Sequence, residues 1–389
     1  MYWKEKDYTN FFSFFYPSTP SEVSVTGLEN PKFKLLLSRI LLTFAWYYNR
    51  KWKMKVIVDN KIPYIREVLE RLADEVVYLP GKEVTPEIVK DADALITRTR
   101  TRCNRELLEG SKVKFIGTAT IGFDHIDTAY CQEAGIAWSN CPGCNAGGVE
   151  QYVHAALLLL QREKGINLKQ TTLGIVGVGH VGSRVQRMAE RMGMRILLND
   201  PPRADKGEEG FTDLRTITEE CDIITFHTPL IREGRYKTFH LANEEFFRSL
   251  KKNVVIINSS RGEVVETEAV LKALNEGQIA DAVIDVWENE PNINLQLLDK
   301  VFIGTPHIAG YSADGKINAT RMVLQALCKH FNLKADFHLE LPADPNAPYS
   351  DNEDIRILQQ YNPFRDYNEL KENPDKFEQL RGDYPLRRE

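Results

Sequence analysis

From residue 54 onward, the chain alternates short apolar runs with stretches in which apolar residues recur every three or four positions. The apolar runs predict buried β-strands, and the periodic stretches predict helices. Five strands are predicted in the first half, at 55–59, 75–80, 93–97, 114–120 and 136–140. The helices predicted between them lie at 62–75, 85–92, 104–110 and 124–135. This alternation indicates a parallel sheet with helices on both faces.

A second cycle of the same kind follows the first. A long helix predicted over 149–163, with Asn145 as its N-cap, leads into it. Its strands are predicted at 172–176, 195–200, 222–229, 253–260, 282–286 and 301–308. A helix predicted over 314–331 could pack back on the first domain. The pattern therefore predicts an α/β protein with two doubly wound parallel-sheet domains, one flavodoxin-like and one of the Rossmann type.

The two ends of the chain do not follow this pattern. The apolar run at 33–48 is interrupted by Ser38 and Arg39, so it is too short and too broken to span a membrane. It also begins too late for an ordinary signal peptide. We expect residues 1–53 to be a non-native or disordered extension, with a membrane-surface anchor as the alternative. From residue 332 onward, prolines, asparagines and charges predict a small appended module.

Composition excludes several classes of protein. The net charge of −5 argues against a general nucleic-acid binder. Six cysteines without a disulfide-framework rhythm indicate a reducing compartment, so we expect a cytoplasmic location. The sequence "CPGC" at 141–144 lacks the second pair that a four-cysteine zinc site needs, and structural thiols are expected there instead of a redox motif. No metal site is predicted.

A glycine-rich motif predicts a bound dinucleotide. Gly177, Gly179 and Gly182 fit GxGxxG between a predicted strand and a predicted helix, and Asp200 follows at the end of the next strand. In this context the glycines let the backbone approach the pyrophosphate. A carboxylate at Asp200 would accept hydrogen bonds from ribose hydroxyls and repel a 2′-phosphate. The motif therefore favours NAD over NADP, although Arg203 nearby leaves NADP open.

Three further residues suggest acid–base chemistry. Arg261 follows a buried strand, at the edge where α/β sheets place ligands, and Glu290 and His307 follow later strands. Each has an ordinary structural explanation when taken singly. Together they offer a cation for a carboxylate, a base near neutral pKa and an acid to tune that base.

A cluster of arginines lies at the end of the third predicted strand. The sequence "ITRTRTRC" places Arg98, Arg100 and Arg102 two positions apart. In an extended backbone all three would lie on one face, because side chains alternate along a strand. Like charges this close repel each other unless water or an anion lies among them. The cluster indicates an anion site or a solvated strand edge.

Four motifs occur in the order and spacing typical of the D-2-hydroxyacid dehydrogenases: "GVGHVG", "NSSRGEVVE", "DVWENEP" and "TPHIAGY". From Met54 to about Phe331 the chain resembles that family. The resemblance implies an NAD-dependent enzyme with a substrate-binding domain over 54–145 and 309–331 and an NAD-binding domain over 146–308. The implied cofactor contacts, beyond the three glycines and Asp200, are His180, Val181, Thr228, Ser259, Asp285 and Gly310.

The resemblance also implies a role for each candidate catalytic residue. His307 would accept the proton of the substrate hydroxyl while hydride moves to the nicotinamide. Glu290 would hold the imidazole and favour its protonated form. Arg261 would bind the substrate carboxylate. Asp285 would accept a hydrogen bond from the nicotinamide carboxamide.

Several shorter stretches, among them "NDPPRADKGEEG", resemble one branch of this family, whose substrate is a four-carbon 2-hydroxy acid with a terminal phosphate. Residues 332–389 resemble that branch's C-terminal dimerisation module in a shortened form, which implies a homodimer. Two alternatives stay open. One is a dehydrogenase for another 2-hydroxy acid, such as phosphoglycerate or hydroxypyruvate, and the other is an NAD-sensing binding protein of the same fold.

A phosphorylated substrate gives the arginine cluster a purpose. The resemblance implies substrate contacts at Thr99, Thr120 and Tyr311. Arg98, or Arg100 beside it, would then bind the phosphate. Arg102 is expected to pair with surface carboxylates instead.

Overall fold

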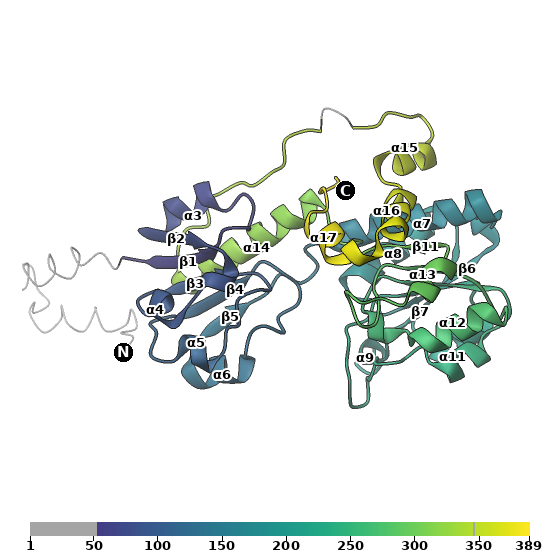
Figure 1. Ribbon diagram of the computed structural model, residues 1–389, viewed down its shortest axis with the longest axis horizontal. Helices are drawn as coiled ribbons and strands as arrows, with labels where there is room; N and C mark the ends of the chain where they lie inside the picture. The colour runs from purple at the N-terminus through teal and green to yellow at the C-terminus, as the bar shows by residue number, and fades with distance from the viewer. Residues whose placement is uncertain (1–52, 345–346) are drawn as a thin grey trace, which may run out of the picture. The chain divides into compact units, whose positions relative to one another are not determined.

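The computed structural model describes residues 53–344 and 347–389 (Figure 1). Residues 54–389 form one compact unit. The expectation of an extension over 1–53 falls outside the described residues. Within the described ranges, no helix is both long enough and apolar enough to cross a membrane.

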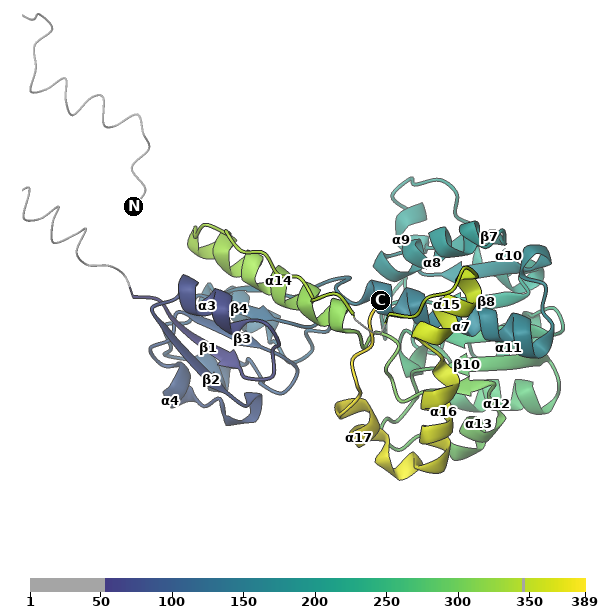
Figure 2. The same cartoon turned by 90° about the horizontal axis from the view of Figure 1, so that it is seen from above.

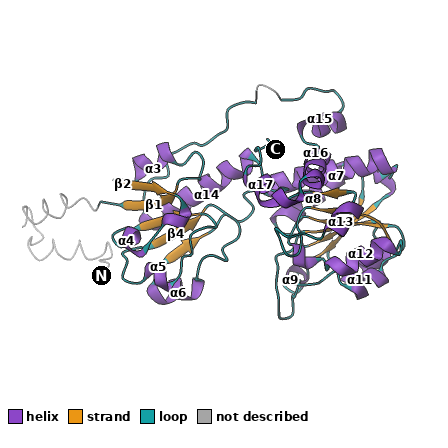
Figure 3. Cartoon of the chain, in the orientation of Figure 1, coloured by secondary structure: helices purple, strands orange, loops and turns teal. Residues whose placement is uncertain are grey.

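The first sheet contains five parallel strands in the order β2-β1-β3-β4-β5, which is the flavodoxin-like order. The strands are β1 (Lys55–Asp59), β2 (Glu75–Leu79), β3 (Ala94–Thr97), β4 (Phe115–Thr118) and β5 (Ala137–Ser139). The helices between them are α3 (Arg66–Leu72), α4 (Pro86–Val89), α5 (Arg105–Leu108) and α6 (Thr128–Ala134). Figure 3 shows helices on both sides of these strands.

Both faces of the first sheet are buried, as the continuous apolar runs predict. Val56 and Val58 belong to one core cluster, together with residues of α3. Ile57, between them on β1, belongs to the opposite cluster, with residues of α4, α5 and α6. Alternate residues of one strand therefore enter two different cores, because side chains along a strand point to opposite faces.

The second sheet contains six parallel strands in the order β11-β10-β9-β8-β6-β7. The strands are β6 (Thr172–Val176), β7 (Arg195–Asn199), β8 (Ile223–Phe226), β9 (Val254–Asn258), β10 (Ile279–Ile284) and β11 (Ile303–Gly304). A Rossmann sheet has a further strand beyond β7, and here an isolated parallel bridge between Leu198 and Phe211 occupies that place. The predicted fold class, two doubly wound parallel-sheet domains, is confirmed.

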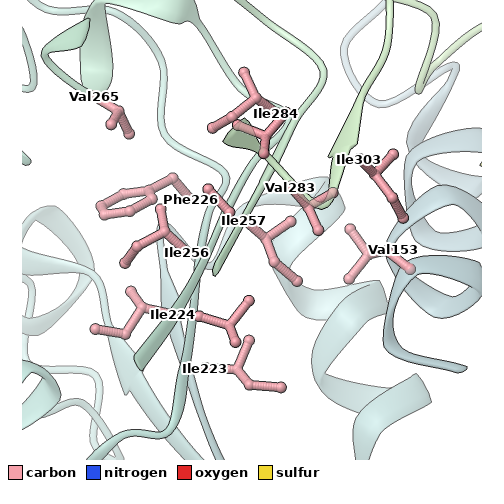
Figure 4. Close-up of a cluster of buried hydrophobic side chains, with 14 of the residues drawn as sticks. Val153, Ile223, Ile224, Phe226, Ile256, Ile257, Val265, Val283, Ile284 and Ile303 are labelled. Carbon is pink, nitrogen blue, oxygen red and sulfur yellow. The ribbon is translucent and has the colours of Figure 1, made fainter. Parts of the chain in front are cut away.

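Helices pack against the second sheet, and together they form one apolar core. The helices are α8 (His180–Arg191), α9 (Pro201–Ala204), α10 (Leu214–Glu220), α11 (Glu244–Ser249), α12 (Thr267–Asn275) and α13 (Leu295–Lys300). Figure 4 shows isoleucines and valines of β8 to β11 packed in one cluster, with Val153 of the long helix α7 (Ala146–Lys164) close to Ile303. The core explains why these strands read as unbroken apolar runs.

The N-cap of α7 is Asn145, as predicted, but without the usual capping hydrogen bond. Its Oδ1 is buried without a partner. A Cβ atom on Gly310 would lie 2.1 Å from Asn145 Nδ2. The Asn145 side chain is therefore packed against the loop that contains Gly310, and tertiary packing overrides the local preference for capping.

The helix α14 (Ala313–Phe331) packs back on the first sheet, as predicted. Val323 and Leu324 are fully buried and join the core cluster of Val56 and Val58. The approach is close, because a Cβ atom on Gly117 of β4 would lie 2.3 Å from Val323 Cγ2. The chain thus crosses to the second sheet and returns to complete the first.

The C-terminal segment packs mainly against the second sheet's core. Its helices are α15 (Glu353–Gln360), α16 (Pro363–Glu372) and α17 (Phe377–Gly382), drawn in yellow-green and yellow in Figure 2. Tyr367, Leu370 and Phe377 are buried in that core, and Tyr367 Oη donates to the carbonyl of Val301 at 2.9 Å. The dimerisation role of this segment stays a prediction.

After α17 the chain returns to the loop before α14. Arg387 donates hydrogen bonds to the carbonyl oxygens of Gly148 and Tyr311, both at 3.0 Å, and also to those of Ile308 and Ala309. These carbonyls belong to the first turn of α7 and to the loop that precedes α14. One guanidinium therefore ties together the two places where the chain passes between the sheets.

The strand β3 ends at Thr97, as predicted, and the arginine cluster does not continue it. Residues 99–101 form a turn and a bend. Thr101 Oγ1 donates to the carbonyl of Gly81 at 2.9 Å, and Cys103 pairs with Ile126 instead of continuing the sheet. The three arginines consequently do not share one strand face.

We predict that Leu324→Ala will lower the free energy of unfolding by about 2–5 kcal/mol, because it leaves a cavity between α14 and the first sheet. Denaturant unfolding followed by circular dichroism measures this loss. Lys329→Ala, at an exposed position of the same helix, should stay within about 0.5 kcal/mol of the parent. Equal stability of both variants would contradict the packing of α14 described above.

Candidate functional site

Three of the predicted site residues come directly after neighbouring strands of the second sheet. Arg261 follows β9, Asp285 follows β10 and His307 follows β11. These strands are adjacent and parallel, so their carboxyl ends meet at one edge, where open α/β sheets bind ligands. Glu290 lies in the loop after β10 and reaches the same edge. The topology thus gathers the predicted catalytic residues.

His307 and Glu290 form a hydrogen-bonded pair, with 2.8 Å between Nδ1 and Oε2. Glu290 Oε1 accepts from the backbone N–H of Trp287 at 2.9 Å. Burial pushes the Glu290 pKa upward, but the hydrogen bond and charge of His307, with help from Trp287 and Arg381, outweigh burial and hold that pKa below its usual value. The carboxylate therefore stays ionised, and the other ring nitrogen of His307 is left to exchange a proton.

Asp285 has a positioning role that the sequence analysis missed. Its Oδ1 accepts from Thr305 Oγ1 at 2.7 Å and from the Ile308 N–H at 2.8 Å, and its Oδ2 accepts from the Ala309 N–H at 3.0 Å. The intervening His307 has a φ of 57° and donates its N–H to the Asp285 carbonyl at 2.8 Å. This buried carboxylate therefore fixes a loop conformation that few non-glycine residues adopt. Its predicted contact with the nicotinamide stays a prediction.

The turn that presents Arg261 is held by Asn258 at the end of β9. Asn258 Oδ1 accepts from the Ser260 N–H at 3.1 Å, and its Nδ2 donates to the Arg261 carbonyl at 3.0 Å. The next residue, Gly262, lies so close to the loop after β10 that a Cβ atom would be 2.0 Å from the Trp287 carbonyl oxygen. The Arg261 side chain is exposed and can reach an anion.

A cavity of about 450 Å³ lies beside the predicted catalytic residues and is lined by Arg261, Glu290 and His307. A second histidine–glutamate pair also lines it, with His240 Nε2 2.7 Å from Glu288 Oε1. This second pair was not predicted from the sequence, in which its members lie 48 residues apart. The cavity shows where a small polar molecule could lie against the catalytic pair.

The glycine-rich loop has the local geometry that the motif predicts. Gly177 has a φ of +88°, and a Cβ atom there would lie 2.8 Å from the His227 carbonyl. A Cβ atom on Gly182 would lie 2.0 Å from the Gly177 carbonyl oxygen, whereas one on Gly179 would meet no atom within 4 Å. The first and third glycines permit close packing, and the second leaves an open approach to the start of α8.

Asp200 lies at the end of β7, next to this loop. Its Oδ2 accepts from the Val178 N–H at 2.8 Å. Arg203, which left NADP open, donates to the Val178 carbonyl at 2.7 Å and pairs with Glu208 at 2.5 Å. Its guanidinium is therefore engaged within the protein. The loop thus presents a carboxylate to a ribose, and the arginine that could have held a 2′-phosphate already has partners.

Two buried hydroxyls near this loop have no partner in the structure. They are Thr228 Oγ1, after β8, and Ser259 Oγ, after β9. Buried polar groups are rarely left unpaired. Together with the open space beside Gly179, these orphaned hydroxyls fit a bound dinucleotide at the carboxyl ends of β6, β8 and β9. When bound, NAD would be held by this loop, and His180 and Val181 begin the helix beside it.

The predicted substrate contacts lie on the first sheet and on the loop before α14. Thr99 is exposed in the turn after β3, and Thr120 follows β4 and donates to the Gly122 carbonyl at 2.8 Å. Tyr311 lies four residues after His307. Their contact with a substrate stays a prediction.

The arginines of the cluster differ in their surroundings. Arg98 is half-buried and makes no ion pair with the described residues, whereas Arg100 is exposed and lies 3.7 Å from Glu378. The surface pairing expected for Arg102 is thus found for Arg100. Exposed pairs of this kind contribute little stability. Of the three arginines, Arg98 keeps both a partly desolvated position and a free charge.

The cysteines of "CPGC" are structural. Cys141 and Cys144 are buried in the first sheet's core. Burial raises the pKa of Cys141 to about 12 and that of Cys144 to about 11. Neither thiol is a thiolate near neutral pH, so the redox alternative is disfavoured. Across 53–344 and 347–389, no three metal-binding side chains come together.

Residues 148–309 match the family described as D-isomer specific 2-hydroxyacid dehydrogenase, NAD binding domain. The erythronate-4-phosphate dehydrogenase of Bacteroides fragilis (strain ATCC 25285) is 62% identical over 342 residues, covering 86% of this chain and 97% of that protein. The enzyme of the same name from Shigella dysenteriae is 49% identical over 293 residues, covering 75% of this chain and 77% of that protein.

Solved structures of dehydrogenases are also similar to this chain in fold. The NAD⁺-bound 3-phosphoglycerate dehydrogenase of Entamoeba histolytica has a TM-score of 0.60 and 28% identity, covering 74% of this chain and 99% of that one. The D-lactate dehydrogenase of Aquifex aeolicus, complexed with NAD and lactic acid, has a TM-score of 0.58 and 27% identity, covering 72% of this chain and 95% of that one.

We predict that Glu290→Gln will lower kcat/KM for NAD reduction by a 2-hydroxy acid by about 100-fold or more, because the amide cannot stabilise a protonated His307. Initial rates of absorbance change at 340 nm measure this loss. Glu219→Gln, which breaks an exposed pair with Arg215, is the matched control and should keep the parent rate. Full activity of the Glu290 variant would exclude the pair from the reaction.

Proposed function

We propose that this chain oxidises 4-phospho-D-erythronate at C2 with NAD. The chain belongs to the D-isomer specific 2-hydroxyacid dehydrogenase family and to its erythronate-4-phosphate dehydrogenase group. The product would be 3-hydroxy-2-oxo-4-phosphooxybutanoate, and the pathway that the group's name implies is pyridoxine biosynthesis. The His307–Glu290 hydrogen bond of 2.8 Å, on strand ends next to Arg261, is the observation that carries the proposal.

The proton of the C2 hydroxyl goes to His307. Its Nδ1 is held by Glu290, so the opposite ring nitrogen faces outward to accept a proton. Glu290 then stabilises the imidazolium that forms. NAD supplies the hydride acceptor, C4 of its nicotinamide. Asp285 keeps the His307 loop in place and would also accept a hydrogen bond from the carboxamide of the nicotinamide.

Arg261 binds the substrate carboxylate and stabilises the oxygen at C2 as it becomes a carbonyl. A guanidinium suits this role because it can donate two parallel hydrogen bonds to a carboxylate. Arg261 is exposed at the edge of the cavity that His307 also lines. Thr99, Thr120 and Tyr311 would make further contacts with the substrate.

The substrate's phosphate calls for a cation that lactate-type enzymes do not need. Arg98 supplies it in this proposal, because it is half-buried and has no carboxylate partner among the described residues. The substrate-binding part would comprise 54–145 and 309–331, and the NAD-binding part 146–308. The C-terminal segment would join two copies into a homodimer, and the enzyme would work in the cytoplasm.

We predict that the protein will form NADH with 4-phosphoerythronate and far more slowly with unphosphorylated erythronate. Arg98→Ala should raise KM for the phosphorylated acid by about tenfold or more, since it removes a charge-assisted contact. The measurement is NADH absorbance over a range of each acid, with Arg102→Ala as the matched control. Equal rates with both acids in the parent protein would assign it to another branch of the family.

A further inference from the structure

Lys316, on the first turn of α14, is a half-buried lysine without a carboxylate partner. No carboxylate oxygen of the described residues lies within 4 Å of its Nζ, whereas Lys164 and Lys272, among others, each pair with an acid within that distance. Its ammonium lies 4.6 Å from the centroid of the Tyr311 ring. Among the described residues, this ammonium therefore has no counter-ion.

The groups around Lys316 add further positive charge. The pKa of Lys316 is lowered to about 8, mainly by burial and also by the charges of Arg98 and Arg381, while the nearby Cys144 acts in the opposite direction. Arg98 follows the end of β3, and Arg381 lies in α17. The charges of two arginines from distant parts of the chain thus act on the Lys316 ammonium.

Arg381 connects this place to the catalytic pair. Its Nη1 lies 3.6 Å from Glu290 Oε2, the same oxygen that bonds to His307. Its Nε is buried and has no hydrogen-bond partner. Glu290 therefore satisfies only part of this guanidinium, and an unpaired donor remains beside the cation cluster.

Gathering three cations is unfavourable unless an anion joins them. Each partly buried charge loses hydration, and like charges repel across the low dielectric of the interior. A lysine that merely covered the Tyr311 ring could be replaced by an apolar side chain without this cost. A phosphate dianion would offset the repulsion and satisfy the unpaired donors.

We propose that Lys316 and Arg381, together with Arg98, bind the terminal phosphate of the substrate and select phosphorylated 2-hydroxy acids. The proposal rests on the proposed function and names two residues on which substrate choice depends. Lys316 contacts the phosphate directly. Arg381 lies between the phosphate and Glu290, so it orients the catalytic carboxylate as the substrate binds.

The test is Lys316→Met, which keeps an unbranched side chain and removes the ammonium. kcat/KM for 4-phosphoerythronate should fall by about 10- to 150-fold, the loss expected for one charge-assisted contact. The slow rate with erythronate should not change, so the preference for the phosphorylated acid should shrink by the same factor. Lys329→Met, on the exposed last turn of α14, is the matched control.

Two binding measurements separate this proposal from the proposed function and from misfolding. Isothermal titration of inorganic phosphate should show binding to the parent protein and to the Lys329 variant, and none to Lys316→Met. The thermal midpoint without phosphate should be equal or higher in Lys316→Met, because an unpaired charge has been removed. Unchanged NADH affinity would confirm that the second sheet is intact.

Each outcome has one meaning. Loss of phosphate binding and of the substrate preference in Lys316→Met supports the site. A variant that keeps both would overturn it, even if the parent protein prefers the phosphorylated acid. If the parent protein binds phosphate through Lys316 but turns over neither acid, the anion site stands and the proposed substrate is wrong. If the parent protein binds no phosphate, the anion site is refuted.

Discussion

The sheet edge that holds the proposed catalytic residues depends on one buried carboxylate, that of Asp285. Asp285 ends the strand β10 and accepts two backbone N–H groups from the residues that follow His307. An ionised or hydrogen-bonded acid at this depth is costly to bury without partners, and the loop supplies those partners only in one conformation. The left-handed backbone of His307 is therefore imposed by its surroundings. The imidazole consequently points at Glu290.

The same loop also links the catalytic residues to the rest of the chain. Beyond His307, Gly310 packs against Asn145 at the start of α7, and Arg387 binds the neighbouring carbonyl groups. The C-terminal segment thus supports the place where the chain returns to the first sheet. Through Arg381 it also touches Glu290. The end of the chain is therefore a structural part of the edge that holds the proposed catalytic residues.

Charge is distributed in a way that suits a doubly anionic substrate. Many lysines and arginines of the described residues pair with acids at the surface, as Arg105 and Arg215 do, and such pairs contribute little. The cations near the catalytic pair differ, since Arg98 and Lys316 have no carboxylate partner in the described part of the chain and Arg381 keeps an unpaired donor. A net charge of −5 for the whole chain hides this local excess. Local desolvation, and not overall composition, makes these residues candidates for anion binding.

The sequence by itself determined the two parallel sheets, because unbroken apolar runs between helices fit only strands buried on both faces. It also located the glycine loop and the Arg261, Glu290 and His307 set, whose motifs are short and local. Only the tertiary structure decided that the backbone turns after Thr97, so that the three arginines do not share one face, since the path of a loop depends on the elements it packs against. It also revealed that the charge of Arg381 acts on Lys316. Interactions between residues far apart in the chain produce no periodic pattern, so the sequence does not predict them.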